Sequence, residues 1–484
     1  MSRARSLLVI LGPLLFFLAP MLAPDSLDPA GARVLGLALW MAVWWVSEVV
    51  PLAATSLLPI VILPLFNLRT ARQAAESYGN ELVYLFLAGF VIAAALERWH
   101  SHARIAYGLV AAIGTSARRV VLGVMVATAF VSLWISNTAT AAMMFPITVA
   151  IGELFDRSES GHRTRMALFL GMAYAASIGG MGTLIGTPPN LVVAGAIKEL
   201  TGQGMDFGRF LLLGLPITLV LLPLTWALLV YVIFRGGASL GASAHELIAE
   251  RRRSMGKLRG GEAIVMTIFI SAALAWFFRE PKDLGGFVVP GLTQIAPGLT
   301  DTGIGLIAAL LLFTVRGRAP DGTTRPLIKW EEAKGLPWDV LLLFGGGLSL
   351  AAAMDSSGLT TWLASHLTGL KGLPLPLLFL GIATLVVVLG EFASNLAVAT
   401  MMMPLAVSLA AAVGQPPVVL MLVAGFSASL GFALPVATPP NAIVFGSGEV
   451  PMRQMVKAGL LIDVVGILVV AILLSFLAPL VLGS

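Results

Sequence analysis

The segment WISNTATAAMMFP (residues 134–146) returns, offset by 258 residues, within EFASNLAVATMMMP (residues 391–404). In both copies a polar Ser-Asn pair interrupts sequence that is otherwise almost entirely apolar. The paired residues are Ser136 and Asn137 in the first copy and Ser394 and Asn395 in the second. A polar pair that is duplicated in apolar sequence predicts two structural repeats that meet at one shared site.

A second duplicated piece follows each Ser-Asn pair. It is GTPPN (residues 186–190) in the first copy and ATPPN (residues 437–441) in the second. Proline is favoured at the first position of a helix, and threonine just before it as the N-cap. Thr187 and Thr438 are therefore expected to start a new helix in the middle of a longer apolar segment.

The composition assigns the chain to the membrane. Hydrophobic residues make up 58% of its 484 residues and charged residues 11%, with a mean hydropathy of +0.94. Soluble domains are far more polar, so we predict an all-α polytopic membrane protein. The chain has no cysteine, which excludes disulfides and thiolate chemistry.

Apolar segments of about 20 residues predict membrane-spanning helices. Eleven are expected, near residues 7–24, 33–47, 50–66, 82–96, 166–198, 211–234, 262–279, 302–315, 339–354, 417–447 and 455–481. Two further apolar segments, 120–152 and 374–412, carry the Ser-Asn pairs near their middles and are too long for one crossing. We interpret each as a re-entrant hairpin of two half-length helices. Its polar tip must face an internal site, because lipid cannot solvate open backbone.

Charged loops predict the orientation in a bacterial-type inner (plasma) membrane. Residues 235–261 hold six basic and two acidic residues, residues 316–338 hold five and three, and residues 280–301 hold one Lys and three acids. Basic loops stay in the cytoplasm, so the amino terminus is expected inside and the carboxyl terminus outside, with no nucleic-acid partner. The second repeat is then inverted relative to the first, and the two hairpin tips can meet near the midplane.

The residues at the tips predict an anion site that is assisted by cations. Two helix N-termini would point at the centre, each with free backbone amides and about half a positive charge. No Lys or Arg occurs in residues 120–156, 166–197 or 373–450, so no basic side chain from these segments can neutralise the anion. Carbonyl, hydroxyl and Asn oxygens at the breaks suit a hard cation such as sodium, which would supply the missing charge.

With these motifs in this order, the chain resembles the divalent anion/sodium symporter family over essentially its whole length. The resemblance implies a homodimer that imports a small di- or tricarboxylate, such as succinate, malate or fumarate, with sodium ions by an elevator mechanism. The substrate residues it implies are Ser136, Asn137, Thr138, Thr187, Ser394, Asn395, Thr438 and Pro439. The sodium ligands it implies are Ser132, Ser136, Asn137 and Gly186 at one site and Gly390, Ala393, Asn395 and Ala437 at the other.

Four regions are expected along the chain. Residues 1–119 would form scaffold helices and an interfacial helix, and residues 120–234 the first transport half. Residues 235–373 would form a basic cytoplasmic linker with further scaffold helices, and residues 374–484 the second transport half. Each transport half is expected to contain one re-entrant hairpin and one broken helix.

Two positions depart from the family pattern, both in the second repeat. Leu396 stands where Thr is common, and Gly390 stands where a Thr often helps to hold the second sodium ion. Sodium-independent dicarboxylate exchange and transport of sulfate or another inorganic oxyanion therefore stay open as alternatives. An anion channel would need a continuous polar path, and an intramembrane hydrolase would need a nucleophile, base and acid that recur together. The sequence offers neither, so no enzymatic activity is expected.

Carboxylates inside the apolar segments are functional hypotheses by default. Glu391 lies three residues before Ser394, close to the second tip, and Asp463 lies on the last apolar segment. Each could bind a cation or proton, or could serve as a structural hydrogen-bond acceptor. We favour the structural role for both.

Overall fold

The computed structural model describes residues 3–114, 116–156, 158–235, 250, 253–283, 288–319 and 322–482. Much of the predicted basic linker, with Arg251 and Arg252, lies outside the described residues. The described chain is almost entirely helical, which confirms the predicted all-α fold. Its strands form two short antiparallel hairpins, β1 (Lys282–Asp283) with β2 (Val288–Val289) and β3 (Arg316–Arg318) with β4 (Thr324–Pro326).

Short connections join the helices of the first half. They are α1 (Arg3–Leu22), α2 (Pro29–Ser47), α3 (Leu52–Thr55), α4 (Leu58–Leu65), α5 (Ala71–Glu76), η1 (Ser77–Gly79), α6 (Glu81–Arg98), α7 (Ser101–Ile113), α8 (Ala117–Ser132), α9 (Asn137–Gly152), α10 (Glu159–Gly180), α11 (Pro188–Thr201) and α12 (Phe207–Ala227), which continues as the π-helix η2 (Leu228–Ile233).

The second half repeats this pattern with further helices at its start. They are α14 (Gly260–Phe277), η3 (Leu292–Gln294), α15 (Asp301–Thr314), α16 (Trp330–Ala333), α17 (Trp338–Ser356), α18 (Leu359–His366), η4 (Thr368–Leu370), α19 (Leu375–Gly390), α20 (Asn395–Val413), α21 (Pro417–Ser427), α22 (Pro439–Gly446) and α23 (Met452–Leu482).

Eight helical segments among the described residues are long and apolar enough to cross a membrane, fewer than the eleven expected spans. Seven fall on expected spans, and the eighth, α20, is an arm of the second hairpin. The expected span at 50–66 is divided into α3 and α4 just before Pro59, which stands in the first turn of α4 and cannot continue the hydrogen bonds of a preceding helix. The span expected at 302–315 is the 14-residue helix α15. The two remaining expected spans, 166–198 and 417–447, are the broken helices.

Both predicted hairpins are present as helix, tip and helix. α8 and α9 enclose the tip at residues 133–136, and α19 and α20 enclose the tip at residues 391–394. Three of the arms have 16 residues and α20 has 19. At 1.5 Å per residue each arm is about 24 Å long or more, so the arms exceed the half-length helices that were expected.

Both predicted helix breaks are also present. α10 and α11 form one broken segment, and α21 and α22 form the other. Thr187 is the N-cap of α11 and Thr438 is the N-cap of α22, each in an extended conformation followed by proline. The duplicated Thr-Pro step therefore starts a helix at the same place in each repeat.

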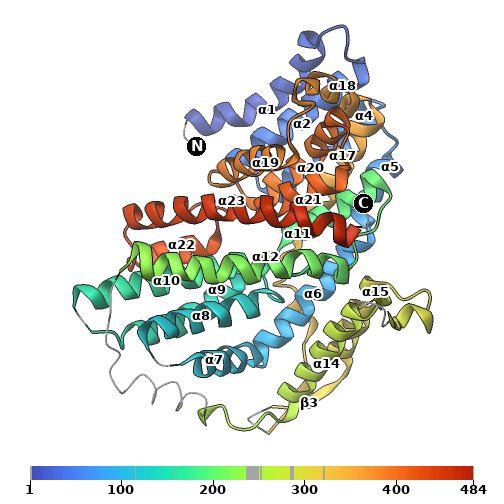
Figure 1. The fold of residues 1–484 in the computed structure, drawn as a ribbon. Helices are drawn as coiled ribbons and strands as arrows, with labels where there is room; N and C mark the ends of the chain where they lie inside the picture. The colour runs from blue at the N-terminus through green and yellow to red at the C-terminus, as the bar shows by residue number, and fades with distance from the viewer. Residues whose placement is uncertain are drawn as a thin grey trace.

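The two repeats pack crosswise. α9 of the first hairpin packs against α22 of the second break, and α20 of the second hairpin packs against α11 of the first break. The long helices α12 and α23 lie side by side across the middle of the molecule (Figure 1). Each half of the central site is thus completed by helices from both repeats.

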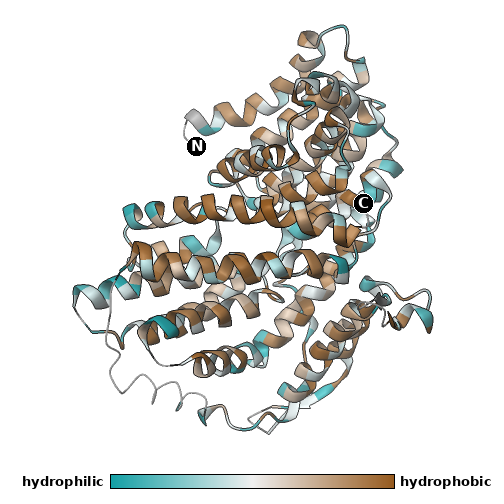
Figure 2. Ribbon diagram, viewed as in Figure 1, coloured by the Kyte–Doolittle hydropathy of each residue, from teal (hydrophilic) through white to brown (hydrophobic). Residues whose placement is uncertain are grey.

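Apolar residues cover the outer helices along their lengths, and polar residues gather near helix ends and in loops (Figure 2). In α1 only 11% of the apolar window Arg5–Leu22 is buried. An apolar surface of this kind would be unfavourable in water and fits contact with lipid hydrocarbon.

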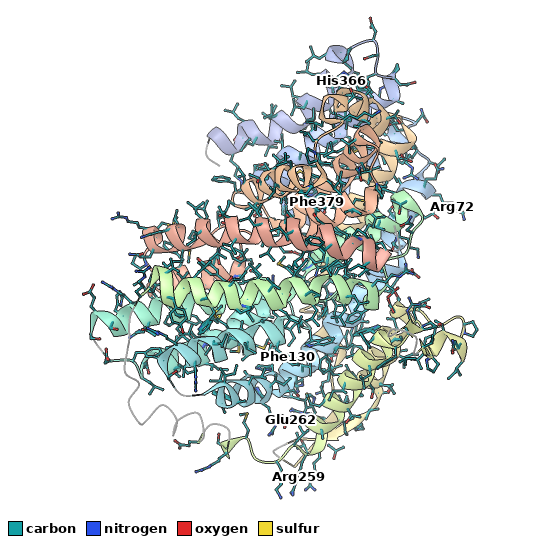
Figure 3. All side chains as sticks on the ribbon, in the orientation of Figure 1. Arg72, Phe130, Arg259, Glu262, His366 and Phe379 are labelled. Carbon is teal, nitrogen blue, oxygen red and sulfur yellow. The ribbon has the colours of Figure 1, made fainter. Side chains whose placement is uncertain are left out.

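Ion pairs hold the helix ends together. Arg104 of α7 donates to both carboxylate oxygens of Glu262 on α14, at 2.6 and 2.9 Å. Glu262 lies at the end of α14 near β3, where Figure 3 labels it beside Arg259. The hydrogen bonds to Glu262 raise the pKa of the Arg104 guanidinium. This bidentate pair fixes α7, the segment that leads into the first hairpin, against α14.

Candidate functional site

A cavity of about 920 Å³ lies where the two repeats meet. Its wall contains both hairpin tips and the first turns of α11 and α22. All eight residues predicted to touch substrate line it: Ser136, Asn137, Thr138, Thr187, Ser394, Asn395, Thr438 and Pro439. The fold therefore gathers both copies of both motifs around one space.

Four helices begin at this cavity. Their N-caps are Ser136, Thr187, Ser394 and Thr438. The first amides of a helix have no partner within the helix and carry a partial positive charge. Where proline stands at the first position, the amide it removes would have been free in any case. The cavity is therefore suited to an anion without a basic side chain.

In the first repeat, side chains join the hairpin to the broken helix. Ser132 Oγ lies 3.0 Å from Asn137 Oδ1 and 2.6 Å from the carbonyl oxygen of Ala176. Asn137 Nδ2 donates to Thr187 Oγ1 at 3.5 Å. Because Ser132, Asn137 and Thr187 are all buried, these bonds form away from water and fix the direction of the Asn137 amide.

Glycines let the first break approach the hairpin closely. A methyl group on Gly180 would collide with the side chain of Asn137. One on Gly186 would stand 2.5 Å from the Gly180 carbonyl oxygen and 2.9 Å from that of Ser132. The predicted cation ligands Ser132, Asn137 and Gly186 are therefore brought together, with Ser136 at the adjacent tip. Their carbonyl, hydroxyl and amide oxygens are ligands that hard cations prefer.

The matching region of the second repeat is more open. A methyl group on Gly390 would stand 3.9 Å from Asn395 Oδ1, an ordinary contact distance. Asn395 Oδ1 is buried but has no hydrogen-bond partner. A methyl group on Gly431 would stand 3.8 Å from the Gly390 carbonyl oxygen and 3.5 Å from Ala437 Cβ. The predicted ligands Gly390, Asn395 and Ala437 thus lie near one another, and Ala393 is buried at the tip.

Each break is closed by an Asn side chain that was not predicted as part of the site. Asn190 Nδ2 donates to the carbonyl oxygens of Gly180 and Thr183 at 2.8 and 2.7 Å. Asn441 Nδ2 makes the same two bonds, to the carbonyl oxygens ten and seven residues before it, at 3.2 and 3.1 Å. The signal for this pair was the asparagine that ends both duplicated TPPN pieces.

Two buried acids hold the unwound part of the second break. Glu391 accepts hydrogen bonds from the amides of residues 433 and 434, at 2.9 and 2.8 Å. Asp463 Oδ1 accepts from the amides of residues 431 and 432, at 3.2 and 3.1 Å. Both acids therefore act as structural hydrogen-bond acceptors here, and these bonds place them beside the second half of the site.

Acidic residues, and no Lys or Arg, are among the residues that line the cavity. The acids are Glu48, Glu97, Glu332 and Asp339. Within the described residues, no group of three or more His, Cys, Asp or Glu side chains could hold a metal ion. The cation ligands on offer near the tips are therefore carbonyl, hydroxyl and amide oxygens, which suit sodium better than a transition metal.

Sequence and structural similarity supports the same arrangement. The family profile described as "Sodium:sulfate symporter transmembrane region" matches residues 2–482. The sodium-dependent dicarboxylate transporter SdcS of Staphylococcus aureus strain bovine RF122 / ET3-1 is 40% identical over 483 residues, 98% of this chain and 91% of that protein. SdcS of strain NCTC 8325 / PS 47 has the same identity and coverage.

The YdaH transporter of Alcanivorax borkumensis, a crystal structure, has a similar fold. It matches with a TM-score of 0.55 at 14% identity, over 92% of this chain and 98% of that one. The fold and the site define a multi-pass membrane transporter of the two-repeat kind. The chain belongs to the sodium:sulfate symporter family, as the resemblance of its motifs predicted.

Proposed function

We propose that the protein is a secondary active transporter, and not an enzyme, that imports a small di- or tricarboxylate together with sodium ions. The observation that carries this proposal is one cavity at which four helices begin and whose lining contains no Lys or Arg. An anion held there by amides and hydroxyls needs cations to balance its charge. The 40% identical relative is named a sodium-dependent dicarboxylate transporter, which favours succinate, malate or fumarate as the substrate class.

The two repeats divide the binding roles in this proposal. The first sodium ion is held by Ser132, Ser136, Asn137 and Gly186, and the second by Gly390, Ala393, Asn395 and Ala437. The substrate carboxylates reach the amides and hydroxyls of Ser136, Asn137, Thr138, Thr187, Ser394, Asn395, Thr438 and the backbone at Pro439. The convergence of these residues around the cavity supports the assignment.

Movement of the site follows an elevator scheme in this proposal. Residues 120–234 and 374–484 form the moving unit, while residues 1–119 and 235–373 form the scaffold and the contact of a homodimer. The crosswise packing of α9 with α22 and of α11 with α20 supports a single moving unit, because each hairpin is tied to the break of the other repeat.

The orientation in a bacterial plasma membrane follows from the same argument, with the amino terminus inside and the carboxyl terminus outside. The cavity lining includes Glu97 at the end of α6, Glu332 in α16 and Pro337 just before α17. Residues 316–338 belong to a basic loop that we place in the cytoplasm. We therefore infer that the structure is open to the cytoplasm.

Uptake by proteoliposomes tests the coupling. Purified protein is reconstituted, and uptake of labelled succinate is measured with an inward sodium gradient, with equal sodium on both sides, and with potassium in its place. Uptake should require sodium and should increase with an inside-negative potential, by about 2.3 kcal/mol of drive for each net charge and 100 mV. Sodium-independent uptake would contradict symport.

Dicarboxylate exchange is the second candidate, and the open second repeat favours it. Gly390 places no hydroxyl where Ser132 places one in the first repeat, so a sodium ion there has one ligand fewer. Liposomes preloaded with unlabelled succinate separate the two schemes: an exchanger takes up label only into preloaded vesicles. Competition by sulfate in the same assay tests the inorganic oxyanion alternative.

A further inference from the structure

A second cavity, of about 550 Å³, lies at the start of α6. Glu81 and Leu82 line it from the first turn of that helix, whereas Phe90 and Glu97 line the cavity at the two tips from later turns. At 1.5 Å per residue, Glu81 and Glu97 are about 24 Å apart along α6. The second cavity therefore lies on the side of the molecule opposite to the cytoplasmic opening that we infer, and we call it the external cavity.

The wall of the external cavity comes from both of the units between which we propose movement. Residues 81–82, 279–281 and 300–302 belong to the proposed scaffold, and residues 194, 198, 204–206 and 209 belong to the proposed moving unit. The scaffold helices α6, α14 and α15 pack together, below α12 and α23 in Figure 1. The external cavity thus lies on the boundary between the two units.

Ion pairs neutralise the basic side chains of this wall. Among the described residues that line the cavity, each Lys or Arg has an acidic partner: Lys198 with Glu81, Arg209 with Asp206, and Arg279 with Asp301. The second pair lies within the moving unit and the third within the scaffold, but the first joins the two units. The charges of this cavity therefore hold its walls together and leave no basic group free to attract an anion.

Two more contacts cross the boundary at the start of α12. Asp301 Oδ2 accepts a hydrogen bond from the backbone amide of Phe207 at 2.8 Å. The Phe207 ring, which is fully buried, stacks on Trp276 of α14 with the ring centroids 5.1 Å apart. Trp276 Nε1 donates to the carbonyl oxygen of Asp301 at 2.8 Å, and Arg279 Nε lies 2.6 Å from Asp301 Oδ1. Asp301 and Trp276 are therefore fixed to each other within the scaffold and hold Phe207 together.

We propose that these contacts form an external latch, made of the Glu81–Lys198 ion pair and of Phe207 held by Asp301 and Trp276. The latch keeps the moving unit against the scaffold while the central site is open to the cytoplasm. This inference rests on the proposed function, because only an elevator movement would carry α11 and α12 past α6 and α15. The latch must open whenever the site moves to the external side, and its strength sets how often the site does so.

Cross-linking tests whether the latch must open during transport. The chain has no cysteine, so Glu81→Cys/Lys198→Cys carries the only two thiols. A short bifunctional methanethiosulfonate reagent should join them, as measured by mass spectrometry, and succinate uptake should fall by about tenfold or more relative to the same protein before treatment. A reductant should restore uptake. Full uptake by the cross-linked protein, or two thiols that do not cross-link, would overturn the latch.

Arg165→Cys/Glu449→Cys is the matched control for the cross-link. Arg165 Nη2 lies 2.6 Å from Glu449 Oε1, and both residues belong to the proposed moving unit. A cross-link between these two positions joins parts that move together, so uptake should be unchanged. Equal losses in the two cross-linked proteins would show that the loss does not come from the boundary and would also overturn the latch.

Thiol labelling tests the latch without any transport assay. Ala194 lines the external cavity from α11 and is 1% exposed, so a cysteine there should react with a membrane-impermeant maleimide only when the latch opens. Lys198→Glu sets two acids opposite each other and should speed the labelling of Ala194→Cys by about two- to fivefold. Adding Glu81→Lys restores an ion pair of reversed polarity and should return the rate toward that of Ala194→Cys alone.

An unchanged labelling rate in Lys198→Glu, or a raised rate that Glu81→Lys does not lower, would overturn the contribution of the ion pair to the latch. The labelling needs neither succinate nor sodium, and purified protein in lipid nanodiscs exposes both faces to the reagent. Wild-type protein without uptake would count against the proposed function, whereas the labelling rates would still decide whether the boundary opens and what holds it closed.

Discussion

The two repeats share their backbone geometry and differ in the chemistry at their tips. Asn190 and Asn441 close the two breaks with identical pairs of hydrogen bonds, to carbonyls ten and seven residues earlier. At the tips, Ser132 lies 3.0 Å from Asn137 Oδ1, whereas the matching Asn395 Oδ1 has no partner. The two repeats therefore share the backbone conformation around the site, but the side chains that could act as ligands differ.

The broken helices are stabilised differently as well. In the second repeat two carboxyls accept four successive backbone amides, from residues 431–434. In the first repeat, hydroxyls approach the break: Thr183 Oγ1 donates to the carbonyl oxygen of Leu133, and Thr218 Oγ1 donates to that of Ile178 at 3.0 Å. The second repeat thus places buried acids where the first uses neutral groups, so the two candidate cation sites lie in different electrostatic environments.

The largest expected effect tests what the repeats have in common. Asn190→Asp and Asn441→Asp each replace an NH2 group that donates to two carbonyls with a carboxylate oxygen that is repelled by them. An uncompensated buried charge costs about 3–5 kcal/mol, so both variants should lose sodium-dependent uptake almost completely and melt at lower temperature. Thermal unfolding in detergent and uptake in proteoliposomes measure the two effects.

Asn80→Asp is the matched control for these variants. Asn80 is an N-cap whose side-chain oxygen accepts from the amide of Leu82, and an aspartate there makes the same bond at the positive end of α6. It should behave as wild type. A large loss for only one of the two break variants would show that the breaks are not equivalent.

Much of the backbone conformation that the two repeats share, the tips and the helix breaks, could be predicted from the sequence. Thr187 and Thr438 were expected as N-caps and are N-caps, because a Thr-Pro step has few other uses in an apolar segment. The two tips were expected around Ser136 and Ser394, where serine followed by asparagine interrupts apolar sequence. Such signals are reliable because they are local. The first amides of a helix need partners wherever the helix starts, and an N-cap side chain supplies one whatever the rest of the fold.

The contacts across the repeats could not be predicted in the same way. Asp463 lies 31 and 32 residues from the amides it accepts, and nothing in the composition of α23 points to them. The span count differed from expectation for a related reason. Hydropathy alone does not give the length of a helix: α15 has only 14 residues, packs on α6 with one face and exposes Ile307, Leu310 and Leu311 on another.

The next largest effect is expected from a substitution that makes the first tip resemble the second. Ser132→Ala removes the hydroxyl beside Asn137 Oδ1 and leaves this oxygen without that partner, as at Asn395. The sodium concentration for half-maximal succinate uptake should rise by about tenfold, which corresponds to about 1.4 kcal/mol. Ser177→Ala is the control, since the Ser177 hydroxyl is buried without a partner and its removal should cost little. An unchanged sodium requirement in Ser132→Ala would contradict the assignment.

A smaller effect distinguishes the two N-cap threonines. Thr438 Oγ1 accepts from the amide of Asn441 at 3.4 Å, whereas Thr187 Oγ1 accepts from the side chain of Asn137 and makes no bond to its own helix. Thr438→Val should therefore lower the free energy of unfolding by about 1 kcal/mol, the usual cost of a lost cap. Both variants remove a hydroxyl that we assign to the substrate and should weaken substrate binding, but Thr187→Val should do so with little loss of stability, because the bond of Thr187 to Asn137 is long, at 3.5 Å. Thermal unfolding and succinate saturation curves separate the two, and a reversed pattern would contradict the different roles.

The smallest expected effect is tighter sodium binding in the second repeat. A side chain at Gly390 has room, because its first carbon would stand 3.8 Å from the carbonyl oxygen of Leu430 and 3.9 Å from Asn395 Oδ1. Gly390→Ser should bring a hydroxyl near that unpartnered oxygen and lower the sodium requirement by about two- to threefold. Gly381→Ser, on the same helix with open space around it, controls for helix propensity alone. If both variants change sodium dependence equally, the hydroxyl is not a ligand and the openness of the second tip has another cause. If only Gly390→Ser does, the missing hydroxyl is what separates the two halves of the site.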